Sequence, residues 1–170
     1  LLPLLDRFEG VPVLLLGDLM LDRYIWGEVS RISPEAPVPV LQVVREDARL
    51  GGAGSVIANL AALGANVHAC GVLGADLPGD KMLELLEALE GVDTSGIVRD
   101  SETHTTQKTR LIARNQHMLR IDRDAVDLPV SALASLRERV LEKLEKVKAV
   151  LISDYDRGVL DGDLCAFVAA

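Results

Sequence analysis

Aromatic residues are scarce in this sequence, and their scarcity narrows the range of folds. Phe, Trp and Tyr together make up 3% of the 170 residues, whereas hydrophobic residues make up 49%. A core of that size must be built from Leu, Val, Ile and Ala, a composition typical of α/β proteins whose parallel strands are buried on both faces. The sequence therefore favours one α/β domain over an all-β sandwich.

Cysteine is also rare, which excludes a fold held by a disulfide framework. The two cysteines, Cys70 and Cys165, are far apart in the chain. Neither has a histidine or a second cysteine at the spacing of a zinc site. We expect two reduced, buried thiols and no metal ligands.

Long apolar runs and a surplus of positive charge are missing as well. No stretch reaches the roughly 20 apolar residues of a membrane-spanning helix, and charged residues follow the apolar start at once. The net charge of −8 would repel nucleic acid and anionic membranes. These absences predict a cytoplasmic protein that binds neither nucleic acid nor membrane.

What the sequence does contain is a β-α-β-α rhythm. Residues 11–17 and 66–72 are short apolar runs typical of buried strands. Residues 51–63 form a small-residue helix with a glycine-rich entry, and a second helix begins near Pro78 and ends at Gly91. This alternation indicates a parallel sheet covered by helices.

Two segments, about residues 24–47 and 103–122, interrupt the rhythm. Three prolines block a helix in the first segment, and the second contains two β-prone stretches around a polar turn. We expect both segments to form a small, strand-rich lid beside the main sheet.

The last third of the chain returns to helix and strand. Residues 131–146 predict an amphipathic helix whose sheet-facing residues are Leu133, Leu136, Val140, Leu141 and Leu144. A core strand over 147–153 follows, and another helix begins at Leu164. Because an α/β sheet that stops there lacks further strands, we expect the fold to be incomplete at its carboxyl-terminal side.

Carboxylates follow two of the predicted strands, where α/β proteins bind ligands. Asp18 and Asp22 come after the first strand, and Asp154 and Arg157 come after the last. A carboxylate that accepts two hydrogen bonds is well matched to vicinal sugar hydroxyls. The alternative for each is a helix-capping or salt-bridged residue on a loop.

A glycine-rich turn provides a further candidate site at Gly51, Gly52 and Ser55. Glycines let a backbone approach a ligand closely, and amides at a helix start attract oxyanions and hydroxyls. The turn lacks the Lys-Ser/Thr of a P-loop, and Ile57 stands where a dinucleotide motif needs its third glycine. Ligand contact and tight helix packing are equally compatible with this pattern.

Basic and amide side chains cluster in the second lid segment of this acidic chain. Guanidinium groups suit a phosphate substituent because they bind it through two parallel hydrogen bonds. A solvated strand face is the alternative. The members are Lys108, Arg110, Arg114, Asn115, Gln116 and Arg120.

These same stretches resemble a known family across essentially the whole chain. The strings GDLMLDRYIWGEVSRISPEAPVPVLQV and LGGAGSVIANLAALGANV are similar to the start of ribokinase-like (PfkB) carbohydrate kinases. Within that family, RISPEAPVPV, TTQKTRLIARNQHMLRIDRD and ISDYDRGVL resemble the heptose 7-phosphate kinases, which are often fused to an ADP-heptose adenylyltransferase.

The resemblance implies a three-layer α/β/α sandwich with a small β lid, which often joins two copies into a homodimer. It implies transfer of the ATP γ-phosphate, with Mg²⁺, to the anomeric hydroxyl of D-glycero-D-manno-heptose 7-phosphate. That reaction belongs to the synthesis of ADP-heptose, a precursor of the lipopolysaccharide core. The 170 residues would be the amino-terminal, substrate-binding part of such a kinase.

The resemblance also assigns roles to individual residues. Asp22 matches the carboxylate that holds sugar hydroxyls, and Gly51, Gly52 and Ser55 lie in the substrate-contacting turn. Asp154 would lie near the substrate, and Arg157 would face a phosphate, close to ATP. The residues expected to recognise the heptose 7-phosphate are Lys108, Arg110, Arg114, Asn115 and Gln116.

Three departures from the family pattern qualify this hypothesis. Ser55 stands where the family usually has Asn, and Arg157 where it usually has Lys. The Gly-Ala-Gly-Asp segment that supplies the catalytic base does not occur in this sequence. We therefore expect no catalytic residue here and no kinase turnover by these residues alone. A kinase of another sugar, or a non-catalytic sugar-phosphate binding module, stays an alternative.

Overall fold

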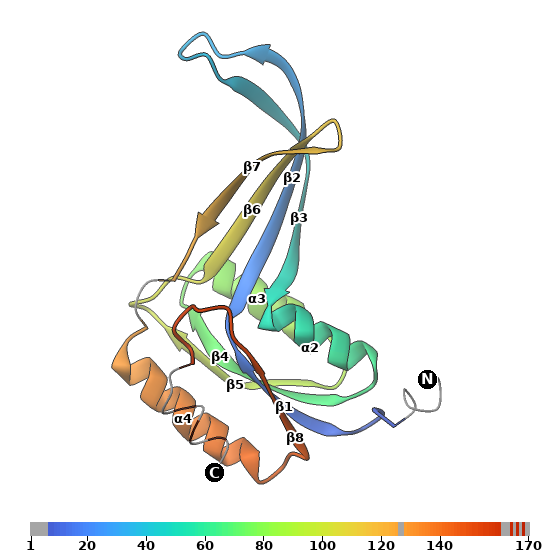
Figure 1. The fold of residues 1–170 in the computed structure, drawn as a ribbon, viewed down its shortest axis with the longest axis vertical. Coiled ribbons are helices and arrows are strands. Elements are labelled where there is room, and N and C mark those ends of the chain that lie inside the picture. Colours follow the sequence, from blue (N-terminus) through green and yellow to red (C-terminus); the bar gives the residue numbers. More distant parts are fainter. Residues whose placement is uncertain (1–6, 126–127, 161–163, 165, 167, 169–170) are drawn as a thin grey trace.

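A four-stranded parallel sheet forms the base of the protein in the computed structural model, which describes residues 7–125, 128–160, 164, 166 and 168. The strands are β1 (Pro12–Gly17), β4 (Asn66–Gly74), β5 (Val92–Asp100) and β8 (Ala149–Ser153), in the order β5-β4-β1-β8 (Figure 1). β1 therefore lies inside the described sheet, with β4 on one side and β8 on the other.

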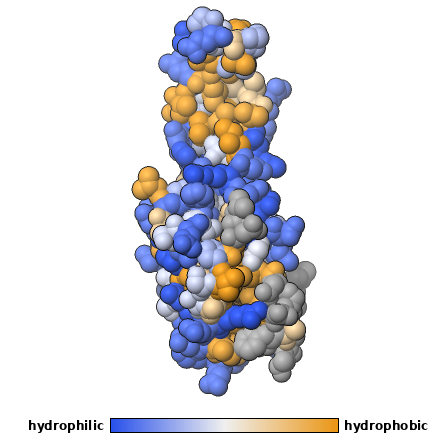
Figure 2. Space-filling model, turned by 90° about the vertical axis from the view of Figure 1, so that its left-hand side faces the viewer, coloured by the Kyte–Doolittle hydropathy of each residue, from blue (hydrophilic) through white to orange (hydrophobic). Residues whose placement is uncertain are grey.

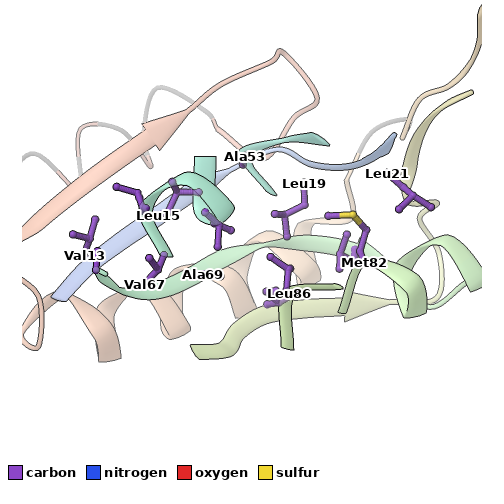
Figure 3. Close-up of a cluster of buried hydrophobic side chains, with 14 residues drawn as sticks. Val13, Leu15, Leu19, Leu21, Ala53, Val67, Ala69, Met82 and Leu86 are labelled. Carbon is purple, nitrogen blue, oxygen red and sulfur yellow. The ribbon is translucent and has the colours of Figure 1, made fainter. Parts of the chain in front are cut away.

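Helices cover both faces of this sheet. The side chains of β1 point alternately to one face and to the other, so β1 contributes to a core on each face. Val13 and Leu15 pack into the core beneath α2 (Ala53–Ala62) and α3 (Leu77–Glu87) (Figure 3). Leu14 and Leu16 pack into a second core beneath α4 (Val130–Leu144), with the buried residues Cys70, Val72, Val98, Ala132, Leu136 and Val140. The fold is thus an α/β/α arrangement, as the sequence predicts.

The second sheet, which we call the lid, rises from one end of the base (Figure 1). Its strands are β2 (Leu19–Ile32), β3 (Pro39–Gly52), β6 (Thr106–Ala113) and β7 (Gln116–Arg123), in the order β3-β2-β6-β7. β2 and β6 run parallel, and the outer pairs are antiparallel. Because β2 begins directly after β1 and β3 ends directly before α2, the lid is anchored at the carboxyl edge of the base.

The face that α4 presents to the sheet differs from the sequence prediction. Leu141, expected in the core, is 50% exposed, whereas Lys143 is buried. The Lys143 Nζ lies 2.5 Å from the Asp93 carboxylate and also donates to the Ser95 hydroxyl. A polar anchor on β5, a strand that the periodicity analysis did not identify, therefore sets the rotation of this helix.

Asp93 also receives hydrogen bonds from two other groups. His68 Nδ1 lies 2.9 Å from its carboxylate, and the Ser95 backbone N–H donates to it at 2.9 Å. Burial alone would raise the pKa of Asp93, but the hydrogen bonds from Lys143, Ser95 and His68 outweigh it and hold the pKa well below its ordinary value. Asp93 therefore stays ionised and ties β4, β5 and α4 together.

The remaining predictions on the base have mixed outcomes. Cys70 is buried as expected, and burial raises the pKa of its thiol to about 12, so the thiol stays protonated. Cys165 lies outside the described residues. Residues 164, 166 and 168 are helical, and the rest of the helix expected there is also outside the described part. No helix in the described ranges is long and apolar enough to cross a membrane.

Candidate active site at the carboxyl edge of the sheet

The strand order identifies where a ligand should bind. β4 and β5 lie on one side of β1, and β8 lies on the other side, so the strand order reverses at β1. Open α/β sheets bind ligands at the carboxyl ends of the strands at such a switch point. Gly17 and Ser153 are register partners and end β1 and β8. Asp18 and Asp154, which follow them, are therefore neighbours at this edge, beside the root of the lid.

Asp18 is the central group of this edge and is 1% exposed. Its carboxylate accepts hydrogen bonds from three backbone N–H groups after β8: Tyr155 at 2.7 Å, Arg157 at 3.2 Å and Val159 at 3.3 Å. Its own carbonyl oxygen accepts from the Ala53 N–H, the first of α2, at 2.9 Å. One buried residue thus holds both the loop after β8 and the glycine-rich helix start.

Asp22 lies further along β2 and is paired with Arg110. The Arg110 Nη1 donates to Asp22 Oδ1 at 2.8 Å, and both side chains are 19% exposed. The hydrogen bond to Asp22 raises the pKa of Arg110, so this ion pair persists across the neutral range. A Cβ atom added at Gly51 would lie 2.9 Å from Asp22 Cγ, so glycine is needed there to leave the carboxylate in place.

The glycine-rich turn is shaped by backbone constraints. Gly52 has φ +54°, a left-handed conformation, and a Cβ there would lie 2.6 Å from the Asp18 carbonyl oxygen. The Ser55 hydroxyl donates to the Gly52 carbonyl at 2.8 Å, which commits its proton to the turn. Ser55 can therefore accept a hydrogen bond from a ligand but has no free proton to donate.

The basic lid residues divide into two groups. Lys108 is the register partner of Asp22, and its Nζ lies 3.5 Å from the Asp122 carboxylate. Arg110 is two positions further along and contacts Asp22. Lys108, Arg110, Asp22 and Gly51 are thus brought together at the root of the lid.

Arg114, Asn115 and Gln116 lie elsewhere, at the hairpin turn between β6 and β7. Arg114 and Asn115 have φ of 49° and 63°, the left-handed pair that a tight hairpin turn requires. The turn follows Ala113, whose register partner is Gly27, five positions beyond Asp22 on β2. At about 3.3 Å per residue, that is ~17 Å from Asp22.

The loop after β8 carries the last two candidates. Asp154 Oδ1 accepts from the Asp156 N–H at 2.8 Å, which closes a local turn, and Asp154 is exposed. The Arg157 Nε lies 3.3 Å from Asp124 Oδ1, close enough for charge attraction, but the two atoms are not aligned as a hydrogen bond. Among the described residues, no hydrogen bond or ion pair joins either side chain to Asp22, and Asp18 links their loop to the glycine-rich turn.

Asp76 is a further organising residue, which the sequence analysis missed. Its carboxylate caps α3 by accepting from the Gly79 N–H at 2.9 Å, and it accepts from the Thr105 N–H at 3.0 Å and hydroxyl at 2.7 Å. Burial acts to raise the pKa of Asp76, but these hydrogen bonds outweigh it and lower the pKa. The sequence Asp-Leu-Pro could have identified Asp76 as the residue that caps α3. Nothing in the sequence indicated that Asp76 also binds Thr105, next to the start of β6.

The chain offers no metal site within its described residues. No three His, Cys, Asp or Glu side chains among them gather where they could hold an ion. The Mg²⁺ implied by the resemblance therefore finds no cluster of three such ligands among the described residues.

Comparison with known proteins identifies the family. The profile of pfkB family carbohydrate kinases matches residues 13–169. The chain belongs to this family.

Curated relatives of this pfkB family chain include two proteins named Bifunctional protein HldE. The protein from Helicobacter pylori (strain P12) is 48% identical over 156 residues, and that from Geobacter metallireducens is 45% identical over 166 residues. The alignments cover 89% and 95% of this chain but 33% of each relative. The chain thus spans about a third of the length of these relatives.

Solved structures with the same fold include other sugar kinases. A putative phosphofructokinase from Staphylococcus aureus superposes with a TM-score of 0.68 at 14% identity, covering 94% of this chain and 48% of that one. The tetrameric inhibited form of phosphofructokinase-2 from Escherichia coli gives 0.67 at 20% identity, covering 94% and 50%. At these identities the likeness establishes the ribokinase-like fold alone.

Replacing Asp18 with alanine should loosen the site of this pfkB family chain more than any other single truncation there. Three backbone N–H groups lose a charged acceptor, and hydrogen bonds to charged groups contribute about 1.5–3 kcal/mol each. We expect a loss of about 3 kcal/mol or more in urea unfolding. The amides of Tyr155, Arg157 and Val159 should exchange with deuterium at least about tenfold faster.

Asp100→Ala is the matched control, because the Asp100 carboxylate accepts one backbone hydrogen bond, from Glu102 at 2.8 Å. Because this single bond is exposed to solvent, we expect its loss to cost no more than about 1 kcal/mol. Unchanged exchange at the three loop amides in Asp18→Ala would show that Asp18 does not hold the loop.

Proposed function

We propose that residues 1–170 are the amino-terminal, substrate-binding part of a kinase that phosphorylates a sugar phosphate. The observation that carries the proposal is the grouping of Asp22, Gly51, Lys108 and Arg110 at the root of the lid. A carboxylate held beside a glycine turn suits sugar hydroxyls, and the adjacent cations suit a phosphate. A ligand that lacks the hydroxyls or the phosphate would leave part of this group of side chains without a partner.

The chemistry of these residues is binding and orientation. Asp22 Oδ1 is engaged by Arg110, which leaves further lone pairs on the carboxylate for sugar hydroxyls. ATP would supply the phosphoryl group that is transferred to the anomeric hydroxyl. Arg157 is our candidate for a contact with a phosphate, and Asp154 for one with the sugar. The catalytic base would come from a Gly-Ala-Gly-Asp segment, which this sequence does not contain.

We further propose D-glycero-D-manno-heptose 7-phosphate as the sugar, in ADP-heptose synthesis in the cytoplasm. The support is the resemblance of three long sequence strings to heptose 7-phosphate kinases and the 45–48% identity to proteins named bifunctional. A fused adenylyltransferase would account for that word. The alternatives are another sugar of the same family or a non-catalytic binding module.

Substituting Asp22 with asparagine tests the sugar site. Asparagine keeps the size of the side chain but removes the charge that pairs with Arg110 and accepts two hydroxyls. We expect calorimetric titration with the heptose 7-phosphate to show affinity at least about tenfold weaker than that of the wild-type chain.

Glu46→Gln is the matched control, since Glu46 is also a lid carboxylate, 2.8 Å from the Arg23 guanidinium. Arg23 follows Asp22, so this second ion pair lies on the opposite face of the strand. The affinity of the Glu46→Gln variant for the heptose 7-phosphate should equal that of the wild type. Equal binding by Asp22→Asn, or a wild type that binds no sugar phosphate in a panel, would contradict the proposal.

We also propose that the lid joins two copies of the chain. Apolar side chains gather on the upper part of the molecule, which is the lid (Figure 2). Exposed apolar residues of the lid strands include Val43, Val44, Met118, Leu119 and Ile121, each 48–70% exposed. A second lid would bury these side chains, and the E. coli structural neighbour is described as tetrameric.

The double substitution of Leu119 and Ile121 with lysine should abolish this assembly. We expect sedimentation velocity to show a dimer for the wild type and a monomer for the variant, because two charges would be buried at the contact. Leu77→Lys, at an 83% exposed position on α3, should leave the dimer intact. A strictly monomeric wild type would rule the lid contact out.

A further inference from the structure

The two residues directly opposite Asp22 on the neighbouring lid strands are both cations. Asp22 on β2 is the register partner of Arg49 on β3 and of Lys108 on β6, so the three side chains rise from the same face of the lid. Side chains that face each other in this way are close enough to form an ion pair. Among the described residues, however, no ion pair joins Asp22 to Arg49 or Lys108, and its Oδ1 oxygen accepts from Arg110 instead.

Arg49 is bound by a different carboxylate, that of Asp47 on the same strand. The Arg49 Nε donates to Asp47 Oδ2 at 2.9 Å, and its Nη2 lies 2.9 Å from the same oxygen. This hydrogen bond lowers the pKa of Asp47, which therefore stays ionised. Because Asp47 is the register partner of Tyr24, two residues beyond Asp22, the ion pair draws the Arg49 guanidinium along the lid and away from Asp22.

The ring of Tyr24 gives Arg49 a second contact. The guanidinium carbon of Arg49 lies 4.9 Å from the ring centre, within the range of a cation–π interaction. Arg110 lies 5.1 Å from the same ring centre. Since β2 lies between β3 and β6, Tyr24 contacts one guanidinium from each neighbouring strand. The ring itself is held by stacking on Trp26, with the ring centres 5.6 Å apart and the planes inclined by 18°.

The second carboxylate oxygen of Asp22 lies on the same side as Arg49. Oδ1 accepts from Arg110, whereas a Cβ atom added at Gly51 would lie 3.0 Å from Oδ2, which places Oδ2 beside the glycine-rich turn. Arg49 lies two residues before Gly51 on β3, and its side chain is 57% exposed. An Arg49 guanidinium released from its present contacts would be free to bind Oδ2 and would then compete with a ligand hydroxyl.

We propose that Tyr24 is a positioning residue of the sugar site. Together with Asp47, it holds the Arg49 guanidinium away from Asp22 and so keeps the Oδ2 oxygen available to a sugar hydroxyl. Tyr24 acts through Arg49 and does not itself touch the sugar. This inference rests on the proposed function and adds to it a reason why the Asp22 carboxylate can accept a ligand while cations surround it.

The position of Arg49 can be tested without any ligand, by a crystal structure of the Tyr24→Ala chain. We expect the Arg49 guanidinium within hydrogen-bond distance of Asp22 Oδ2, because the ring no longer holds it. Asp47→Asn, which removes the ion pair but keeps the ring, should show the same movement. An Arg49 that keeps its present position in both variants would overturn the proposal.

Calorimetric titration with the heptose 7-phosphate tests the consequence for binding. Tyr24→Ala and Asp47→Asn should each bind it about tenfold more weakly, since a hydrogen bond to a charged acceptor is lost. Tyr24→Phe keeps the ring face and should rescue the affinity. Tyr24→Ala combined with Arg49→Gln should also regain the wild-type affinity, because the competing cation is absent. The matched control for Asp47→Asn is Glu46→Gln, a change to the neighbouring carboxylate on the opposite face.

The double variant separates a positioning role from a merely structural one. If it binds as weakly as Tyr24→Ala, Tyr24 does not act through Arg49, and the proposal fails. Weaker binding by Arg49→Gln alone would also overturn it, because Arg49 would then contact the ligand. A wild type that binds no sugar phosphate, together with the expected movement of Arg49 in both crystal structures, would overturn the proposed function but support the role of Tyr24 in holding Arg49.

Discussion

The buried carboxylate of Asp18 is the interaction on which the site depends. Three backbone N–H groups after β8 converge on it, and its own carbonyl oxygen caps the first turn of α2. Because the loop and the helix start otherwise belong to distant parts of the chain, their mutual position follows from this one residue. A charged group buried to this extent is stable only when fully hydrogen-bonded, and here the backbone satisfies it.

The lid is connected directly to the part of the base that Asp18 holds in place. β2 continues from β1 and β3 leads directly into α2, so the lid cannot move without disturbing the turn that Asp18 holds. The parallel pairing of β2 with β6 then places Lys108 and Arg110 beside Asp22. Asp76 secures the start of β6 through Thr105. Sheet register therefore determines which basic residues lie beside Asp22.

The sequence predicted the helices and most strands well, because apolar runs, glycine stops and a proline at a helix start are local signals. β5 escaped notice because Val92–Asp100 mixes polar and apolar residues. Lys143 was not among the predicted sheet-facing residues, because its partner, Asp93, is 50 positions away. The pairing of Asp22 with Arg110 spans 88 positions, and the separation of Arg114 from both depends on strand register. Composition and residue spacing show neither which distant residues pair nor how the strands are aligned.

The most direct test of the account is a crystal structure of the chain with a sugar phosphate bound. The account predicts sugar hydroxyls within hydrogen-bond distance of the Asp22 carboxylate, at the root of the lid and above the carboxyl edge of the base sheet. A sugar bound on the opposite face of the lid, or at the amino ends of the parallel strands, would contradict it.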